Sequence, residues 1–197
     1  MKLARILCVI LSLVLVSTSV AGCERGTPAP SAAVKINEVM FNPFGEDAGK
    51  EWLELYNSDL RSHDIKGWVI SNRNGDAVAT LPEWTLPSSS YLLIVFGSGT
   101  NDSDFTDGTG IFYTQGNLEV LNNIQDEVAI YAGSPKASTI LDFISWCSDG
   151  DYEVGKPHKH AISAKQWSKG SFLDLGFPSG KSLLGGFSIG RDKDSTD

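Results

Sequence analysis

The stretch VKINEVMFNPFGEDAGKEWLELYN, residues 34–57, sets the character of the fold. Apolar Val34 and Ile36 alternate with polar neighbours, and the alternation returns in KEWLELYN, residues 50–57. A period of two residues is typical of a strand with one buried face. The turn-forming residues of NPFGEDAG, 42–49, separate the two runs. The stretch therefore predicts two strands joined by a turn.

Short runs of the same kind follow along the chain. They are IKGWVIS (65–71), AVATLP (77–82), YLLIVF (91–96), NLEVLN (117–122), DEVAIYA (126–132) and STILDFISW (138–146). Asn74-Gly75 between two of them is a strong hairpin signal. No helix-length period occurs through residue 146, and the only helix we expect is a short one around 161–167. About eight strands at this spacing predict an all-β sandwich or barrel, followed by a less regular C-terminal extension.

The first 22 residues resemble an export signal. Lys2 and Arg5 precede the apolar run ILCVILSLVLV, residues 6–16. That run is much shorter than the roughly 20 residues that a membrane-spanning helix needs. A basic start, a short apolar core and small residues after it predict a secretory signal peptide. An uncleaved membrane anchor is the alternative.

The end of this leader, Val20-Ala21-Gly22-Cys23, is similar to the lipobox of bacterial lipoproteins. The resemblance implies cleavage between Gly22 and Cys23 and a diacylglycerol on the Cys23 thiol. Ordinary secretion, with a free thiol at Cys23, is the alternative. Residues 24–33, rich in Pro, Gly, Ser and Ala, read as a flexible linker. We therefore expect an exported protein anchored by lipid to a bacterial membrane, the outer one if the host has two.

The chain that remains after the leader is acidic. Without Lys2 and Arg5, 14 Lys and Arg stand against 24 Asp and Glu, a net charge of −10. This balance argues against nucleic acid as a partner and against a basic patch that lies on anionic lipid. With Cys8 in the leader and Cys23 lipidated, Cys147 has no cysteine to pair with. We expect Cys147 to be a small buried hydrophobe rather than a nucleophile.

Several segments, in order, resemble the lamin tail domain. They are INEVMFNPFGEDAGKEWLELYN (36–57), DIKGWVIS (64–71), ATLPEWTLPSSSYLLIVFG (79–97), LNNIQDEVAIYA (121–132) and ILDFISW (140–146). AISAKQWSKGSFLDL and the closing SIGRDKDSTD look like the extended ending of bacterial members. The resemblance implies an immunoglobulin-like β-sandwich of about eight to nine strands over residues 34–197. It also implies an interaction surface, which is the role of the domain in nuclear lamins.

Side chains that could support hydrolysis have simpler explanations. Glu38, Glu51 and Glu54 alternate with apolar residues, as the solvent face of a strand requires. Asp142, His158 and Ser163 could be combined into a triad, but no nucleophile-elbow sequence surrounds the serine. We therefore predict that the protein is not an enzyme.

Metal binding has two weak candidates. Two acidic segments share one spacing, Asp102, Asp104, Asp107 and Asp192, Asp194, Asp197. Such clusters suit Ca²⁺, although neither has the EF-hand spacing, and solvated acidic loops are the alternative. His158 and His160 could bind a metal from one face of a strand, but no third ligand is near, so we expect a solvated loop. No other cofactor is expected.

Five tryptophans are candidates for partner contacts. Trp52, Trp68 and Trp146 lie within strand patterns and are expected in the core. Trp84, between two prolines, and Trp167, flanked by lysines, are the better candidates for exposed rings that anchor a ligand.

Together these features predict a membrane-anchored surface lipoprotein with a non-catalytic lamin-tail domain. The domain would serve as a protein-interaction or adhesion module, with a surface protein or polysaccharide as partner. A carbohydrate- or cell-wall-binding module is the alternative, and an accessory to a metal-dependent hydrolase is a more distant one. The chain could also be part of a longer protein.

Overall fold

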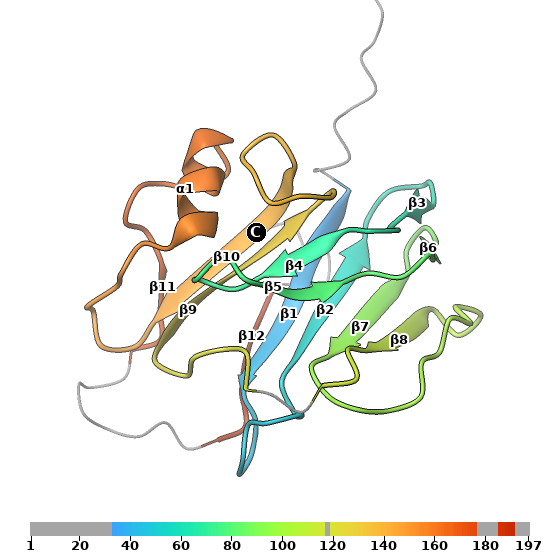
Figure 1. Ribbon diagram of the computed structural model, residues 1–197, viewed down its shortest axis with the longest axis horizontal. Helices are drawn as coiled ribbons and strands as arrows, with labels where there is room; N and C mark the ends of the chain where they lie inside the picture. The colour runs from blue at the N-terminus through green and yellow to red at the C-terminus, as the bar shows by residue number, and fades with distance from the viewer. Residues whose placement is uncertain (1–32, 117–118, 177–184, 192–197) are drawn as a thin grey trace, which may run out of the picture.

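Two five-stranded β-sheets pack face to face in the computed structural model of the protein (Figure 1). The structure describes residues 33–116, 119–176 and 185–191. The leader, Gly22, Cys23 and most of the linker lie outside the described residues. The all-β, immunoglobulin-like sandwich predicted from the sequence is confirmed.

The first sheet contains the strand pair predicted from residues 34–57. Its strands, in spatial order, are β12 (Phe187–Gly190), β1 (Val34–Asn42), β2 (Trp52–Asn57), β7 (Tyr91–Val95) and β8 (Thr109–Tyr113). Neighbouring strands are antiparallel except β7 and β8, which are parallel. A register shift between Ile36 and Glu38 moves the inward positions of β1 from Ile36 to Val39. Such a bulge adds a residue to one strand and lets both halves of β1 face the core.

The second sheet is built around two longer strands. In spatial order its strands are β11 (Leu173–Asp174), β10 (Ile140–Cys147), β9 (Gln125–Tyr131), β4 (Val69–Ser71) and β5 (Ala77–Thr80). All pairs are antiparallel except β10 with β11. A separate short pair joins β3 (His63–Asp64) to β6 (Thr85–Leu86). The turn between β4 and β5 contains Asn74-Gly75, with Gly75 at φ 80°, so the predicted hairpin is confirmed.

The core fills the space between the two sheets. Val39, Leu53, Ile94, Val128 and Trp146 belong to it and are fully buried. These residues come from the inward face of each strand, as the period of two residues predicts. Each Å² of apolar surface removed from water stabilises the fold by about 25 cal/mol, so this interior is the main source of stability.

The described residues contain twelve strands rather than the expected eight to nine, and their local structure differs from the prediction in several places. Residues 119–122 of the expected strand 117–122 form no strand, while β8 has no counterpart among the predicted strands. The helix, α1, spans Lys156–Ser163 and so begins before the expected 161–167. Pro157 lies in the first turn of α1, where backbone N–H groups have no acceptor within the helix. The N–H group that proline lacks therefore costs the helix no hydrogen bond. Within the described ranges, no helix is both long and apolar enough to cross a membrane.

Candidate interaction surface

Residues 149–176 contain helix α1, which lies against the outer face of the second sheet, and the edge strand β11, and we call these residues the C-terminal layer (Figure 1). Helix α1 contacts β9 and β10. Ala161 of the helix packs in a second apolar cluster with Tyr131, Ile140 and Phe143 of the strands. This cluster lies apart from the core between the sheets. As a result β9 and β10 are buried on both faces.

A buried carboxylate from β9 caps the start of α1. The N-cap residue Gly155 offers no side-chain cap. Instead, the backbone N–H of Gly155 donates to Glu127 Oε1 at 2.6 Å, and that of His158 donates to Oε2 at 3.0 Å. A carboxylate at a helix N-terminus satisfies free N–H groups and interacts favourably with the helix dipole. A Cβ atom on Gly155 would lie 2.3 Å from the Arg73 carbonyl oxygen, so the close approach requires glycine.

A chain of hydrogen bonds extends from this carboxylate into the C-terminal layer. The Tyr152 hydroxyl donates to Glu127 Oε1 at 2.6 Å and lies 2.7 Å from His158 Nδ1. The Gly170 N–H donates to His158 Nε2 at 3.2 Å, which makes Nε2 the acceptor. His158 is therefore neutral, and its Nδ1–H donates to the tyrosine oxygen. We call Glu127, Tyr152 and His158 the polar clamp.

Burial shifts the pKa of each side chain in the polar clamp. It raises the pKa of Glu127, against the lowering effect of the hydrogen bonds that the carboxylate accepts. It lowers the pKa of His158 and raises that of Tyr152. The prediction that His158 lies on a solvated loop is wrong, because His158 belongs to helix α1 and its side chain is fully buried. His160 lies on the same helix, with Nδ1 3.0 Å from the Tyr131 hydroxyl.

Arg73, from the β4–β5 turn, adds a second connection. Its backbone N–H donates to buried Asp126 at 3.0 Å, and its carbonyl accepts the N–H of Lys156 at 3.2 Å. Its guanidinium lies 3.1 Å from Glu153 Oε2. The C-terminal layer is thus fastened to the sheet at several points around the start of α1.

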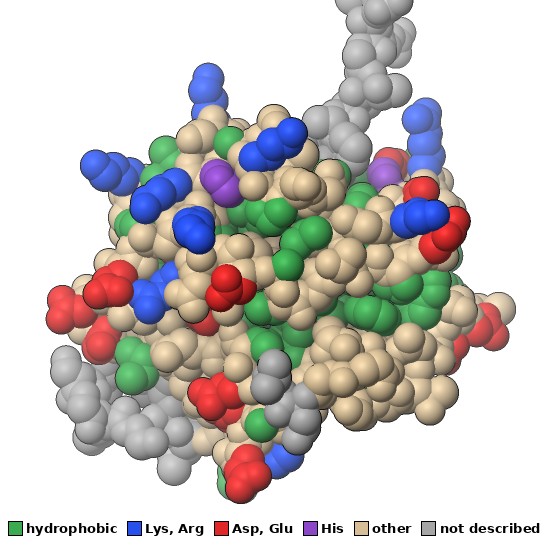
Figure 2. All heavy atoms as spheres, viewed as in Figure 1, with side chains coloured by type: hydrophobic (Ala, Val, Ile, Leu, Met, Phe, Trp, Pro, Cys, Tyr) green, Lys and Arg blue, Asp and Glu red, His purple; other side chains and the backbone are tan. Residues whose placement is uncertain are grey.

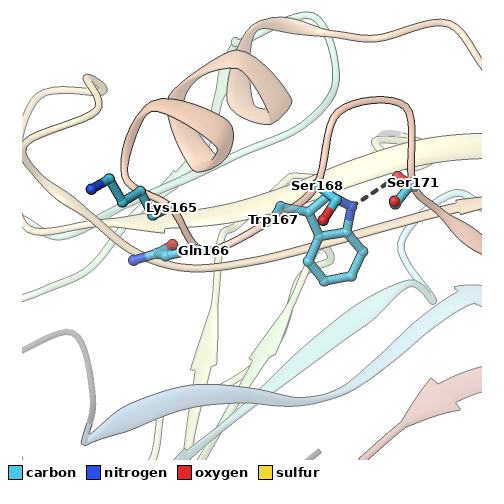
Figure 3. A pocket seen from close by; sticks show the side chains of 5 residues that line it. All are labelled: Lys165, Gln166, Trp167, Ser168 and Ser171. Carbon is cyan, nitrogen blue, oxygen red and sulfur yellow. Dashed lines mark hydrogen bonds between the residues drawn. The ribbon is translucent and has the colours of Figure 1, made fainter.

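Trp167 borders an open hollow of 360 Å³ on the C-terminal layer (Figure 3). The indole Nε1–H donates to the Ser171 carbonyl at 2.8 Å, and the ring packs edge-on against Phe143. Lys165 and Gln166 point away from the indole, so the lining side chains do not converge (Figure 3). The expected exposure of Trp167 is therefore only partial, because its ring and its N–H group contact Phe143 and Ser171.

Four exposed lysines lie on helix α1 and in the segment that follows it, and one of them, Lys165, lines the hollow. They are Lys156, Lys159, Lys165 and Lys169. Residues 154–173 contain no Asp or Glu, and none of the four lysines forms an ion pair with the part of the chain that the structure describes. Figure 2 shows Lys and Arg gathered around α1, with Asp and Glu mainly below and to the right. The acidic balance of the chain is therefore not shared by this face.

The other tryptophans differ partly from expectation. Trp84 is half-buried and packs edge-on against Phe105 and Phe112, at centroid distances of 6.5 and 5.9 Å. Its predicted role as an exposed anchor therefore finds no support in its packing. Trp68 and Trp146 are buried as predicted, whereas Trp52 is half-buried on the outward side of β2.

Glu51 lies in the interior, so the prediction that it occupies the solvent face is wrong. Its carboxylate accepts the N–H of Val120 at 2.6 Å and that of Leu121 at 3.2 Å. Burial raises the pKa of Glu51 to about 8, against the opposing effect of these N–H groups. Glu38 and Glu54 are half-buried and directly opposite each other on β1 and β2. Asn37 donates to Glu54 at 2.6 Å, and burial raises the pKa of Glu54.

The acidic loop proposed for calcium holds its carboxylates apart. Asp102, Asp104 and Asp107 each accept a backbone N–H two residues further along, at 2.9 to 3.0 Å. Within the described ranges, no three His, Cys, Asp or Glu side chains are grouped so as to hold a metal ion. Asp192, Asp194 and Asp197 lie outside the described residues, so calcium binding there stays a prediction.

The residues of the rejected triad serve separate contacts. Asp142 forms an ion pair with Arg191 and accepts the Ile36 N–H at 2.8 Å. The Ser163 hydroxyl donates to a carbonyl of its own helix. Cys147 is fully buried, as predicted, and burial raises the pKa of its thiol.

Sequence reasoning missed Glu127, Tyr152 and Arg191 as key contacts. One signal was present. Glu127 and Asp142 are carboxylates within the apolar runs DEVAIYA and ILDFISW, and a charge inside a buried strand requires a partner. The identities of the partners depend on segments distant in sequence, so the runs themselves could not reveal them.

Two comparisons with known proteins bear on identity. No curated protein matches the chain. The family model for the lamin tail domain matches residues 27–148, which contain all of the strands from β1 to β10. The C-terminal layer begins where this match ends. Because the match covers more than half of its length, the chain belongs to the lamin tail domain family.

Proposed function

We propose that the protein is an exported lipoprotein whose lamin tail domain acts as a non-catalytic interaction module, held at a membrane through Cys23. The basic start, short apolar core and Val20-Ala21-Gly22-Cys23 sequence of the leader support export and lipidation. The family supports an interaction role, because its immunoglobulin-like domain often mediates protein contacts. Two acyl chains on one cysteine would supply stable membrane residence.

One observation carries the non-catalytic part of the proposal. Glu51 binds backbone N–H groups, Asp142 binds Arg191, and His158 is enclosed in the polar clamp. These three side chains, which could otherwise perform acid–base chemistry, are thus engaged in contacts that stabilise the fold. The sandwich then offers its surface, rather than a catalytic centre, to a partner.

The anchor is tested by comparing the wild type with the variant Cys23→Ala in cells of a bacterial host. We expect an alkyne-bearing fatty acid to label the wild type alone, and only the wild type to sediment with membranes. Equal labelling and equal sedimentation of both proteins would contradict the lipid anchor.

The interaction role is tested by proximity crosslinking on intact cells with the same two proteins. We expect a discrete protein partner to be captured by the tethered form and to be lost with Cys23→Ala. Tethering raises the effective concentration of the module near its target, so weak contacts suffice. If neither form captures a protein, the module does not act through a protein partner.

A carbohydrate- or cell-wall-binding module is the second candidate, and the hollow beside Trp167 favours it. An aromatic ring with Ser168 and Ser171 beside it combines stacking and hydrogen bonding. Sedimentation of both forms with purified cell wall would support this candidate. Absence of wall binding by both forms would exclude it.

A further inference from the structure

The lysine face, which we define as Lys156, Lys159, Lys165 and Lys169, carries positive charge on an otherwise acidic protein. We propose that this face docks on an anionic lipid surface and so orients the domain on the membrane that anchors it. The role as an orienting contact rests on the proposed lipid anchor. The attraction between the lysine face and anionic headgroups does not depend on it.

The position of the chain end supports a membrane as the occupant. Strand β1 begins at the upper edge of the first sheet, and α1 also lies in the upper half of the view, to the left (Figure 1). Residues 24–33 separate Cys23 from the start of β1 at Val34. Ten residues span at most about 35 Å when fully extended. A lipid on Cys23 would therefore keep the start of β1 within about 35 Å of the membrane, so that the lysine face can reach the headgroups.

Charge on the remainder of the protein does not prevent this contact. Glu153, the acidic residue just before the segment 154–173, forms an ion pair with Arg73 at 3.1 Å. Residues 154–173 carry no acidic side chain, and Figure 2 shows the acidic groups mainly away from α1. A membrane that meets this face therefore encounters the lysines first.

The make-up of the face favours lipid headgroups over a protein partner. Protein interfaces depend on large apolar or aromatic anchors at their centre. Between Lys156 and Lys169 the structure exposes no large apolar side chain, and the one aromatic ring, Trp167, is half-buried against Phe143. An ammonium group on a flexible stem acts as a point charge toward phosphate and needs no fixed geometry. Each lysine near an anionic surface contributes about 1 kcal/mol.

The test uses the full chain with Cys23→Ala, so that acylation plays no part. Sedimentation compares vesicles of phosphatidylcholine alone with vesicles in which part of the lipid is phosphatidylglycerol. We expect binding to the anionic vesicles only, with a marked loss when salt is raised several-fold, because screening weakens exposed charge contacts.

Two variants with the same change in net charge make the test specific for the face. Lys159→Glu with Lys169→Glu reverses two charges on the lysine face. Lys50→Glu with Lys66→Glu reverses two exposed lysines in loops of the sandwich. We expect the first variant to lower partitioning by about tenfold or more and the second to change it by less than about twofold. Melting temperatures equal to that of the parent establish that both variants are folded.

Several results would overturn the proposal. They are equal losses in both variants, equal binding to neutral vesicles, and no binding to anionic vesicles. Retention on an immobilised acidic polysaccharide without vesicle binding would assign the lysine face to a glycan instead. A failure of lipid labelling in cells would remove the anchor but leave the vesicle result intact, so the two proposals fail separately.

Discussion

The sandwich interior and the C-terminal layer are held together by different interactions. Between the sheets, apolar side chains such as Leu53 and Ile94 are fully buried and make non-directional contacts. At the C-terminal layer, a small apolar cluster is joined by the polar clamp and the Arg73 contacts, each with its own geometry. The burial of apolar side chains follows from the composition of the strands and their two-residue period. Hydrogen bonds between distant segments depend instead on the exact placement of the donor and the acceptor.

This difference predicts how each region fails. Loss of an interior side chain leaves a cavity and weakens the whole sandwich, because every strand shares the same core. Loss of one polar partner in the layer leaves another buried group unsatisfied, but the sheets beneath keep their own contacts. Four substitutions test this contrast, from the largest expected effect to the smallest.

Trp146→Ala should have the largest effect. The side chain is fully buried, packs against Phe41 at 5.1 Å between ring centroids, and donates to the Asn122 carbonyl. We expect the free energy of unfolding to fall by about 3–5 kcal/mol, measured by chemical denaturation. The half-buried Trp84→Ala is the matched control and should cost less. Equal losses would show that burial between the sheets does not dominate stability.

Glu51→Gln should change the pH dependence of stability. Because its folded pKa of about 8 exceeds the 4.5 of an unburied glutamate, the stability that Glu51 contributes is present below pH 4.5 and is lost as pH rises to about 8. Between pH 5 and 8 the wild type should therefore lose up to about 3 kcal/mol more than the variant. Denaturation at several pH values measures the difference.

Two controls isolate Glu51 from other titrating groups. The lowered pKa of His158 acts with the opposite sign, since its contribution is lost as pH falls below 6.5, and it is common to both proteins. Exposed Glu46→Gln should leave the pH profile of the wild type unchanged. Parallel profiles for wild type and Glu51→Gln would mean that the Val120 and Leu121 N–H groups fully offset the burial of the carboxylate.

Asp142→Asn should weaken the attachment of β1 and of Arg191, the residue after β12, to the second sheet. The carboxylate pairs with Arg191 and accepts the Ile36 N–H, joining β10 of one sheet to β1 and the residue after β12 in the other. Both side chains of the pair are about 15% exposed, so we expect a loss of about 2 kcal/mol, below that of a fully buried pair. Hydrogen exchange should accelerate at Ile36 and Arg191. Exposed Asp151→Asn should leave both amides unaffected, and similar rates in both variants would contradict the role of the pair.

Tyr152→Phe should have the smallest effect, of about 1 kcal/mol, and a local one. The change removes the hydroxyl between Glu127 and His158 but keeps the ring. Hydrogen exchange should accelerate at Gly155 and Gly170, while the amides of β9 stay protected. Tyr56→Phe, on the outward side of β2, is the control. Faster exchange throughout the sandwich would show that the C-terminal layer and the sheets unfold as one unit.

Much of the sandwich could be predicted because its strands carry their own pattern. The runs at 34–41 and 50–57 alternate in polarity, the run at 91–96 is continuously apolar, and each forms a strand within a few residues of its expected bounds. Strand β8, TGIFY, escaped notice because its side chains are mostly half-buried at the edge of the sheet and alternate weakly. Its pairing with β7 is parallel, so no adjacent hairpin signals it.

The C-terminal layer could not be predicted in the same way. The apolar runs of β9 and β10 indicated strands, but not that a helix covers their outer face. Continuous apolar character is what a strand buried on both faces requires, and it carries no information about the covering element. The position of α1 depends on Glu127, which lies 28 residues before Gly155 and supplies the cap that the helix itself lacks.

By itself, the sequence determined the all-β class, most strands of the sandwich, the β4–β5 hairpin and the burial of Cys147. These features depend on local periodicity, turn residues and cysteine count, which neighbouring positions encode. Only the tertiary structure decided that Glu51 is buried and that His158 is a neutral member of the polar clamp. Such properties arise when segments far apart in sequence meet, because burial and local charge belong to the assembled surface rather than to any one stretch of chain.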